Sequence, residues 1–166
     1  MDGSTFAPKA RMQNPALMYP EVMQALQAVG RAANGHGVPP KTLELIHMRV
    51  SQINGCALCL DMHARSLKQA GETDERLFTL AAWRETTYFT PAERAALALA
   101  EAATRLSDRA EPVSDEVWDE AARHYDEAAL GAIIIAITAI NAWNRLNVTT
   151  RQSPGSIPAS ATAHRR

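Results

Sequence analysis

The chain has 166 residues, 46% of them hydrophobic and 21% charged, a composition typical of a soluble globular domain with a sizeable core. Its 17 basic and 18 acidic residues leave a net charge of -1, which gives no electrostatic reason to expect nucleic acid or an anionic membrane as a partner. No apolar run follows a basic start in residues 1–12, so we expect no secretory signal and a cytoplasmic protein.

Helix signals dominate the chain and strand signals are nearly absent, which predicts an all-α fold of about seven helices. The first helix is expected over residues 15–33. The second is expected over residues 39–54, because proline suits its first turn and glycine follows its end. The third starts at the two cysteines and ends at Gly71.

The second half of the chain continues the helical pattern. Thr73 is expected to cap a fourth helix that turns Leu77, Leu80 and Ala81 inward. A capping box with proline at the first helical position opens the fifth, alanine-rich helix at Thr90. The last three helices are expected over residues 90–106, 114–125 and 127–148.

One helical domain is therefore expected over residues 15–150, between an N-terminal arm (1–14) and a flexible C-terminal tail (151–166). The tail is rich in serine, proline and alanine and has almost nothing to bury. The apolar stretch 128–142 is shorter than the ~18–20 residues of a membrane span. We therefore expect it to be a buried core or subunit-interface helix, with no membrane partner.

The motif that carries the chemistry begins at Cys56. Cys56 and Cys59 are the only cysteines in the chain, and His63 follows one helical turn later. In a helix the three side chains share one face, and the spacing from Cys59 to His63 lets the imidazole reach the thiol. Gly55 places Cys56 at the helix start, where backbone N–H groups and the helix dipole favour an anion such as a thiolate. The pattern predicts a dithiol redox centre that can close a disulfide locally.

Glu44 lies on the preceding helix, at the flank of its apolar stripe. The Asn-Gly turn reverses the chain direction, so the next helix packs against this one and we expect Glu44 to face His63. A carboxylate hydrogen-bonded to an imidazole orients it and raises its basicity, which gives a nucleophile at Cys59, a base at His63 and an orienting group at Glu44. His47 lies one turn after Glu44 and is either a supporting partner of the Glu44–His63 pair or, on the simpler interpretation, a plain surface or core residue.

A zinc site is the alternative use of these residues. Cys56, Cys59 and His63 could supply three ligands, with Glu44 or His47 as the fourth. Structural zinc sites usually join a C-x-x-C pair to a second, distant pair of ligands, and that second pair is missing here. We therefore expect neither a metal nor an organic cofactor.

The combination of Glu44, eleven intervening residues, C-x-x-C and then His63 resembles the AhpD-type alkylhydroperoxidases of the carboxymuconolactone decarboxylase superfamily. The flanking stretch LIHMRVSQING before the cysteines, Ala64-Arg65 after the motif and residues 140–146 resemble that family too. The resemblance covers residues 15–148. It implies an AhpD-like all-α fold and assembly into a homo-oligomer, commonly a trimer or hexamer.

The resemblance also implies roles for the residues. The cysteine matching Cys59 attacks the peroxide and becomes a sulfenic acid, the cysteine matching Cys56 resolves it to a disulfide, and the residues matching Glu44 and His63 relay the proton. The implied function is a thiol-dependent peroxidase or disulfide reductase, an antioxidant oxidoreductase that uses a hydroperoxide and an external dithiol. Leu58 stands where the best-studied members carry a second histidine, so one member of their relay is missing here.

Two other functions are compatible with the sequence. The first is a non-catalytic thiol redox sensor or disulfide-carrying adaptor, which the missing relay histidine at Leu58 favours. The second is a lactone decarboxylase of the carboxymuconolactone type, whose chemistry does not rely on a C-x-x-C redox pair. The presence of both cysteines argues against the decarboxylase.

Overall fold

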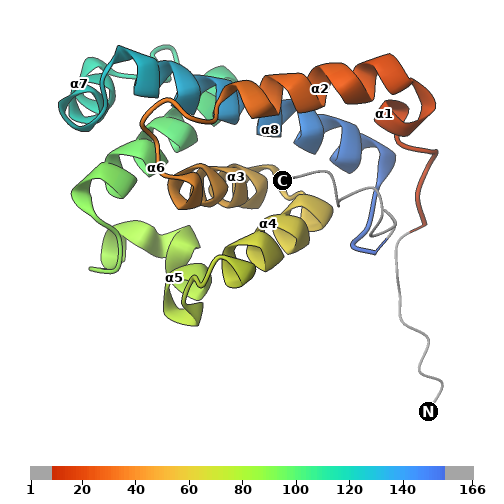
Figure 1. The fold of residues 1–166 in the computed structure, drawn as a ribbon, viewed down its shortest axis with the longest axis horizontal. Helices are drawn as coiled ribbons and strands as arrows, with labels where there is room; N and C mark the ends of the chain where they lie inside the picture. Colours follow the sequence, from red (N-terminus) through yellow and green to blue (C-terminus); the bar gives the residue numbers. More distant parts are fainter. Residues whose placement is uncertain (1–8, 156–166) are drawn as a thin grey trace.

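The computed structural model describes residues 9–155, apart from the side chain of Asp108. This part of the chain forms eight α-helices and two short 3₁₀ helices and contains no strand, so the predicted all-α class is confirmed (Figure 1). The elements are α1 (Pro15–Met18), α2 (Pro20–Ala32), α3 (Pro40–Asn54), α4 (Ala57–Gln69), α5 (Asp74–Thr79), η1 (Leu80–Glu85), α6 (Pro91–Thr104), η2 (Leu106–Asp108), α7 (Asp115–His124) and α8 (Glu127–Thr150).

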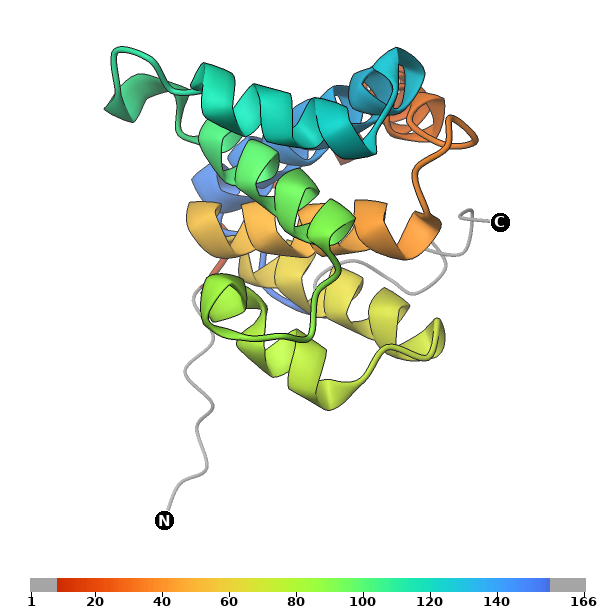
Figure 2. The ribbon, with the colours of Figure 1, turned by 90° about the vertical axis from the view of Figure 1, so that its left-hand side faces the viewer.

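Helix α3 lies at the centre of the molecule, and α4, α6 and α8 all pack against it (Figures 1 and 2). Its apolar residues belong to two hydrophobic clusters. Ile46 and Val50 belong to a larger cluster that includes much of α8, whereas Leu45 and Met48 belong to a second cluster with residues of α4, α5, η1 and α6. Because both sides of α3 are buried, the position of Glu44 on this helix is set by packing on both sides.

Helix α8 is the long apolar helix that the sequence predicts. By length and composition it could cross a membrane, the one described helix that passes this test. Half of its residues are nevertheless buried against the rest of the chain, and α2, α3 and α6 pack against it. Such burial is what the core helix of a folded domain shows, in agreement with the expectation of a buried core helix.

Two local predictions are wrong, and each has a physical reason. The helix expected over residues 15–33 is broken at Tyr19, whose φ and ψ of -119° and 97° are extended. Pro20 follows, and a proline disfavours the helical conformation of the residue before it. Ala81 is exposed rather than buried, because the α-helix ends at Thr79 and the tighter 3₁₀ turns after it change the side-chain period.

The chain before α1 runs along the C-terminal end of α8. The backbone N–H of Arg11 donates to the carbonyl of Thr150 at 2.9 Å, and its guanidinium donates to the carbonyl of Thr149, also at 2.9 Å. The described part of the predicted N-terminal arm is therefore attached to the domain. Residues 156–166 of the predicted tail lie outside the described residues.

A buried carboxylate on α6 ties the helices together. Glu101 accepts hydrogen bonds from Arg49 at 2.6 Å, from Trp83 at 2.9 Å and from Arg84 at 2.5 Å. Burial alone would raise the pKa of Glu101, but these donors outweigh it and hold the pKa below its usual range. One carboxylate thus joins α6, α3 and η1 while it is only 7% exposed.

We expect the substitution Glu101→Ala to destabilise the fold by about 3–5 kcal/mol, because it removes the carboxylate that pairs with the largely buried Arg49 guanidinium. Urea unfolding measures the loss, and Glu120→Ala, at an exposed ion pair on α7, is the control with a change of at most about 0.5 kcal/mol. The pKa of Glu101 is lowered, so its contribution is complete at neutral pH and is lost as pH falls through the folded-state pKa. A difference between wild type and variant that persists unchanged into acid would contradict this account.

Candidate redox site

The site is built around the short connection between α3 and α4. Helix α3 ends at Asn54, and Gly55 adopts a left-handed conformation with φ of 68° and ψ of 31°. Glycine suits this conformation because a Cβ atom would strain it. Cys56 then takes the N-cap position of α4 with an extended backbone. The predicted turn is confirmed, and the first cysteine lies at the cap rather than inside the helix.

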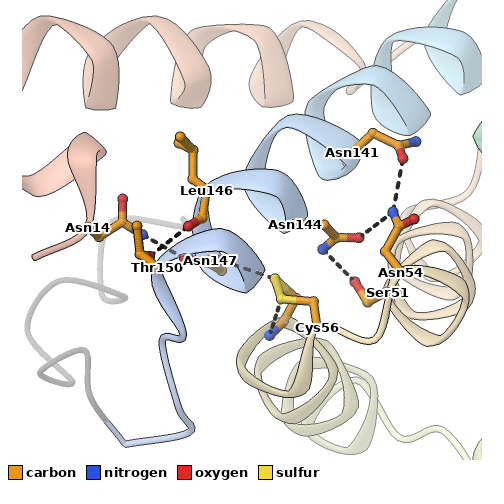
Figure 3. The surroundings of a disulfide bond; sticks show 10 residues. Asn14, Ser51, Asn54, Cys56, Asn141, Asn144, Leu146, Asn147 and Thr150 are labelled. Atoms are coloured by element: carbon orange, nitrogen blue, oxygen red, sulfur yellow. Dashed lines mark hydrogen bonds between the residues drawn. A yellow bond between two sulfur atoms is a disulfide. The ribbon is translucent and has the colours of Figure 1, made fainter. Parts of the chain in front are cut away.

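Cys56 and Cys59 form a disulfide, with their Cα atoms 5.4 Å apart (Figure 3). The backbone N–H of Cys59 donates to the sulfur of Cys56 at 3.4 Å, so this sulfur acts as the cap of α4. Both residues are buried, with exposed fractions of 1% and 3%. The local pairing that the spacing allows is therefore present, and the α4 N-terminus faces a sulfur atom.

The predicted contact between the two helices is also present. His63, on the same face of α4 as Cys59 and 4% exposed, places its Nδ1 atom 2.9 Å from Oε2 of Glu44 on α3. Burial would raise the pKa of Glu44, but His47 and His63 outweigh it and hold the pKa well below its usual range. An ionised carboxylate only accepts hydrogen bonds, so the proton of this hydrogen bond is on Nδ1 of His63.

His47 takes part in this arrangement more closely than the sequence suggests. Its Nδ1 atom lies 3.7 Å from Oε1 of Glu44, and its ring centroid lies 4.8 Å from that of His63. The Glu44 carboxylate is therefore placed between two imidazoles, one on each oxygen. The sequence favours a plain surface or core role for His47 over a supporting one, because three-residue spacing on a helix is common in solvated and packed faces alike.

Two asparagines far from the motif complete the surroundings of the sulfurs. The side-chain amide of Asn147, near the end of α8, donates to Sγ of Cys59 at 3.2 Å (Figure 3). The amide of Asn14, which is the N-cap of α1, donates to Oδ1 of Asn147 at 2.6 Å and fixes its orientation. Both side chains are buried. The signal that could have indicated Asn147 is a polar residue on the buried side of an apolar helix.

Other amides on α8 connect it to α3 beside the site. Asn54 donates from one side-chain nitrogen to Oδ1 of Asn141 at 2.9 Å and of Asn144 at 3.0 Å. Asn144 in turn donates to the hydroxyl of Ser51 at 3.1 Å. Asn141 and Asn144, polar residues on a mostly apolar helix, thus both have partners, and these bonds set the position of α8, which carries Asn147 (Figure 3).

Leu58, between the two cysteines, is buried in the larger hydrophobic cluster and 2% exposed. It packs against the core and offers no group for proton transfer. The zinc arrangement that would use both cysteines is absent from this state, because the two sulfurs are bonded to each other. Among the described residues, the Asn147 amide and the backbone N–H of Cys59 donate to the sulfurs, and Glu44, His47 and His63 form a separate polar cluster on α3 and α4.

Comparison with known proteins agrees with the fold and the motif. The profile of the carboxymuconolactone decarboxylase family matches residues 20–102, which include α3 and α4 with the cysteines. The uncharacterised protein YdfG of Bacillus subtilis is 37% identical over 129 residues, 78% of this chain and 86% of YdfG. The alkyl hydroperoxide reductase AhpD of Bradyrhizobium diazoefficiens is 44% identical over a shorter stretch of 43 residues, 26% of this chain and 24% of that enzyme.

A solved structure shows the same architecture. ATU0492 from Agrobacterium tumefaciens, a protein of unknown function suggested to be the antioxidant defence protein AhpD, has a TM-score of 0.81 and 32% sequence identity. The match covers 88% of this chain and 98% of that protein. With the family profile, the close relative and the shared fold in agreement, the chain belongs to the carboxymuconolactone decarboxylase family, as an AhpD-like member with a C-x-x-C pair.

Proposed function

We propose that the protein is a thiol-dependent peroxidase of the alkyl hydroperoxide reductase type. The observation that carries the proposal is the Glu44–His63 pair on the same side of α4 as the Cys56–Cys59 disulfide. A cysteine pair that cycles between dithiol and disulfide within one helical turn can deliver two electrons from its dithiol state. A buried imidazole with a fixed tautomer, one turn after Cys59, provides the base that thiol chemistry requires.

The proposed cycle begins with the reduced pair. Nε2 of His63, oriented by Glu44, takes the proton of the Cys59 thiol. The thiolate attacks one oxygen of a hydroperoxide, the O–O bond breaks, and the departing oxygen takes a proton and leaves as alcohol or water. Cys59 is then a sulfenic acid, which the Cys56 thiol attacks to form the disulfide with release of water. An external dithiol reduces the disulfide, and its own two thiols become a disulfide.

Asn147 supports the assignment of Cys59 as the attacking cysteine. Its amide donates to Sγ of Cys59, and a donor that points at a sulfur stabilises the thiolate more than the neutral thiol. Cys56 lies at the helix cap, where its sulfur already accepts the N–H of Cys59. The two sulfurs therefore have different surroundings, which favours distinct roles as the attacking and resolving cysteines.

The burial of the pair bears on its partners. With Cys56 and Cys59 1% and 3% exposed, a narrow hydroperoxide and a slender dithiol suit the site better than a broad protein surface. An adaptor that hands its disulfide to partner proteins needs that bond near the surface, so burial favours the enzyme over the adaptor. Homo-oligomerisation is part of the proposal, since Ile134 on the apolar helix α8 is 41% exposed.

The redox step can be tested by counting thiols. Reduced protein treated with one equivalent of a hydroperoxide is expected to lose both thiols to alkylation, measured as a mass shift, and a dithiol is expected to restore them. Cys59→Ser is expected to abolish peroxide consumption, whereas Cys56→Ser leaves a sulfenic acid at Cys59 that a dimedone-type reagent traps. Two cysteines that stay alkylatable after peroxide treatment would refute the proposal, and the reverse mutant pattern would exchange the two roles.

The orienting role of Glu44 can be tested by the substitution Glu44→Gln. The amide removes the charge that fixes the His63 tautomer, so the rate of peroxide-dependent disulfide formation is expected to fall on the order of 10²-fold. Stopped-flow measurement of Trp fluorescence or of residual thiol follows the rate. Glu21→Gln, exposed on α2, is the matched control and is expected to react as wild type does. Equal rates in the two variants would remove Glu44 from the mechanism.

The substitution Asn147→Ala tests the hydrogen bond to the sulfur. Loss of a donor worth about 1.5 kcal/mol to a thiolate is expected to lower the thiolate fraction and slow alkylation of reduced Cys59 about tenfold near pH 7. The difference from wild type is expected to vanish at high pH, where the thiol ionises in both proteins. Thr138→Ala, at an exposed position of the same helix where the hydroxyl donates to the carbonyl of Ile134, separates this effect from a general change in α8. A similar slowing in both variants would contradict the assigned role.

A further inference from the structure

Glu44, His47 and His63 form a cluster of potential metal ligands that the thiol chemistry does not fully use. Each residue contributes one ligand atom, and the three atoms lie within 4.8 Å of one another. Two of the ligands come from one helix at the spacing Glu-x-x-His, which presents both side chains on one face. The third comes from the neighbouring helix α4, so the packing of α3 on α4 brings the set together.

The geometry is close to that of a zinc site. Zinc holds nitrogen and oxygen ligands at about 2.0–2.2 Å in a tetrahedral arrangement, so two ligand atoms around one ion lie about 3.3–3.6 Å apart. Movements of less than about 1 Å in the side chains, within the reach of rotamer adjustments, would bring the three atoms to these distances. Two imidazoles and a carboxylate form a ligand set that zinc uses where a fourth position stays open.

One nitrogen of the cluster is placed where a bound cation would give it a partner. Nδ1 of His47 is buried and has no hydrogen-bond partner among the described residues. The oxygen of Glu44 that it faces lies 3.7 Å away, beyond hydrogen-bonding distance. A buried nitrogen without a partner normally costs free energy, and a cation between this nitrogen and the carboxylate would remove that cost.

We propose that Glu44, His47 and His63 bind one Zn²⁺ ion, independently of the two cysteines. The combination of imidazole nitrogens with a carboxylate favours Zn²⁺ over the hard cations Mg²⁺ and Ca²⁺, which prefer oxygen ligands. The ion displaces the proton that Nδ1 of His63 carries in the Glu44 hydrogen bond, and its fourth position is open to water. The binding itself does not depend on the proposed peroxidase activity.

Zinc at this site has a consequence that does rest on the proposed function. A histidine with a metal on Nδ1 keeps its remaining proton on Nε2, so the ring has no lone pair with which to accept the thiol proton. The ion would act as an inhibitor of the thiol chemistry rather than as its cofactor. The carboxylate that orients the base would then serve as a metal ligand, and the two states exclude each other.

The test is zinc binding to full-length protein that carries no histidine tag and keeps its disulfide intact, so that the cysteines cannot act as ligands. Competition with a chromophoric chelator is expected to give one Zn²⁺ per chain with a micromolar or lower Kd. His47→Ala, His63→Ala and Glu44→Gln are each expected to weaken binding at least tenfold. Mg²⁺ and Ca²⁺ are expected not to compete, and bound zinc is expected to raise the Tm.

Two variants keep the result interpretable. His124→Ala removes a histidine that pairs with Glu120 on the exposed side of α7, and it is expected to bind zinc as wild type does. Cys56→Ser/Cys59→Ser is expected to retain the site, because its ligands exclude sulfur. Equal affinity of wild type and His47→Ala, or loss of binding in His124→Ala or in the double serine variant, would overturn the proposal. None of these measurements uses peroxide, so a failure of the peroxidase proposal would leave the zinc result standing.

Discussion

The rest of the site depends on the connection between α3 and α4, in which only Gly55 and Cys56 separate the two helices. Its left-handed glycine lets the chain reverse without strain, and the reversal packs α4 along α3. That packing places His63 against Glu44 and positions Cys56 at the start of a helix. A longer connection would allow α4 to pack on α3 in several positions, and the imidazole would not be held against the carboxylate. The short turn is therefore the constraint that determines the site geometry.

Glu44, Sγ of Cys59 and Asn147 each have a polar partner that offsets the cost of burial, whereas Nδ1 of His47 has no hydrogen-bond partner among the described residues. Glu44 is ionised between two imidazoles, the Cys59 sulfur receives the Asn147 amide, and Asn14 holds that amide in place. In a medium of low polarity these interactions are stronger than in water, and an unpaired member would be costly. The same carboxylate can accept the Nδ1–H hydrogen bond of His63 or bind the proposed metal ion, and these two states exclude each other.

The helix limits and the turn at the site can be predicted from the sequence, because they depend on residues that are close together in the chain. Proline, glycine and capping residues predict most of the helix limits, and the spacing of Glu44, Cys59 and His63 predicts their contact once the turn at Gly55 is assumed. Asn147 and Asn14 are out of reach of such reasoning, since they lie far from the cysteines in the chain and reach them only through the packing of α8 and α1. The prediction for Ala81 fails for a local reason. The Thr73 cap is predicted correctly, but it gives no information on the change to 3₁₀ geometry after Thr79, which turns Ala81 outward.

The central claim is that the Cys56–Cys59 pair reduces hydroperoxides through a Cys59 thiolate formed by the Glu44-oriented His63. The most direct measurement is the product balance when fully reduced protein reacts with an aromatic hydroperoxide in the absence of other reductants. The account predicts one alcohol formed per disulfide closed, with repeated turnover once a dithiol is added. Disulfide formation without an equal amount of alcohol, or alcohol formed equally well by the Cys59→Ser variant, would contradict it.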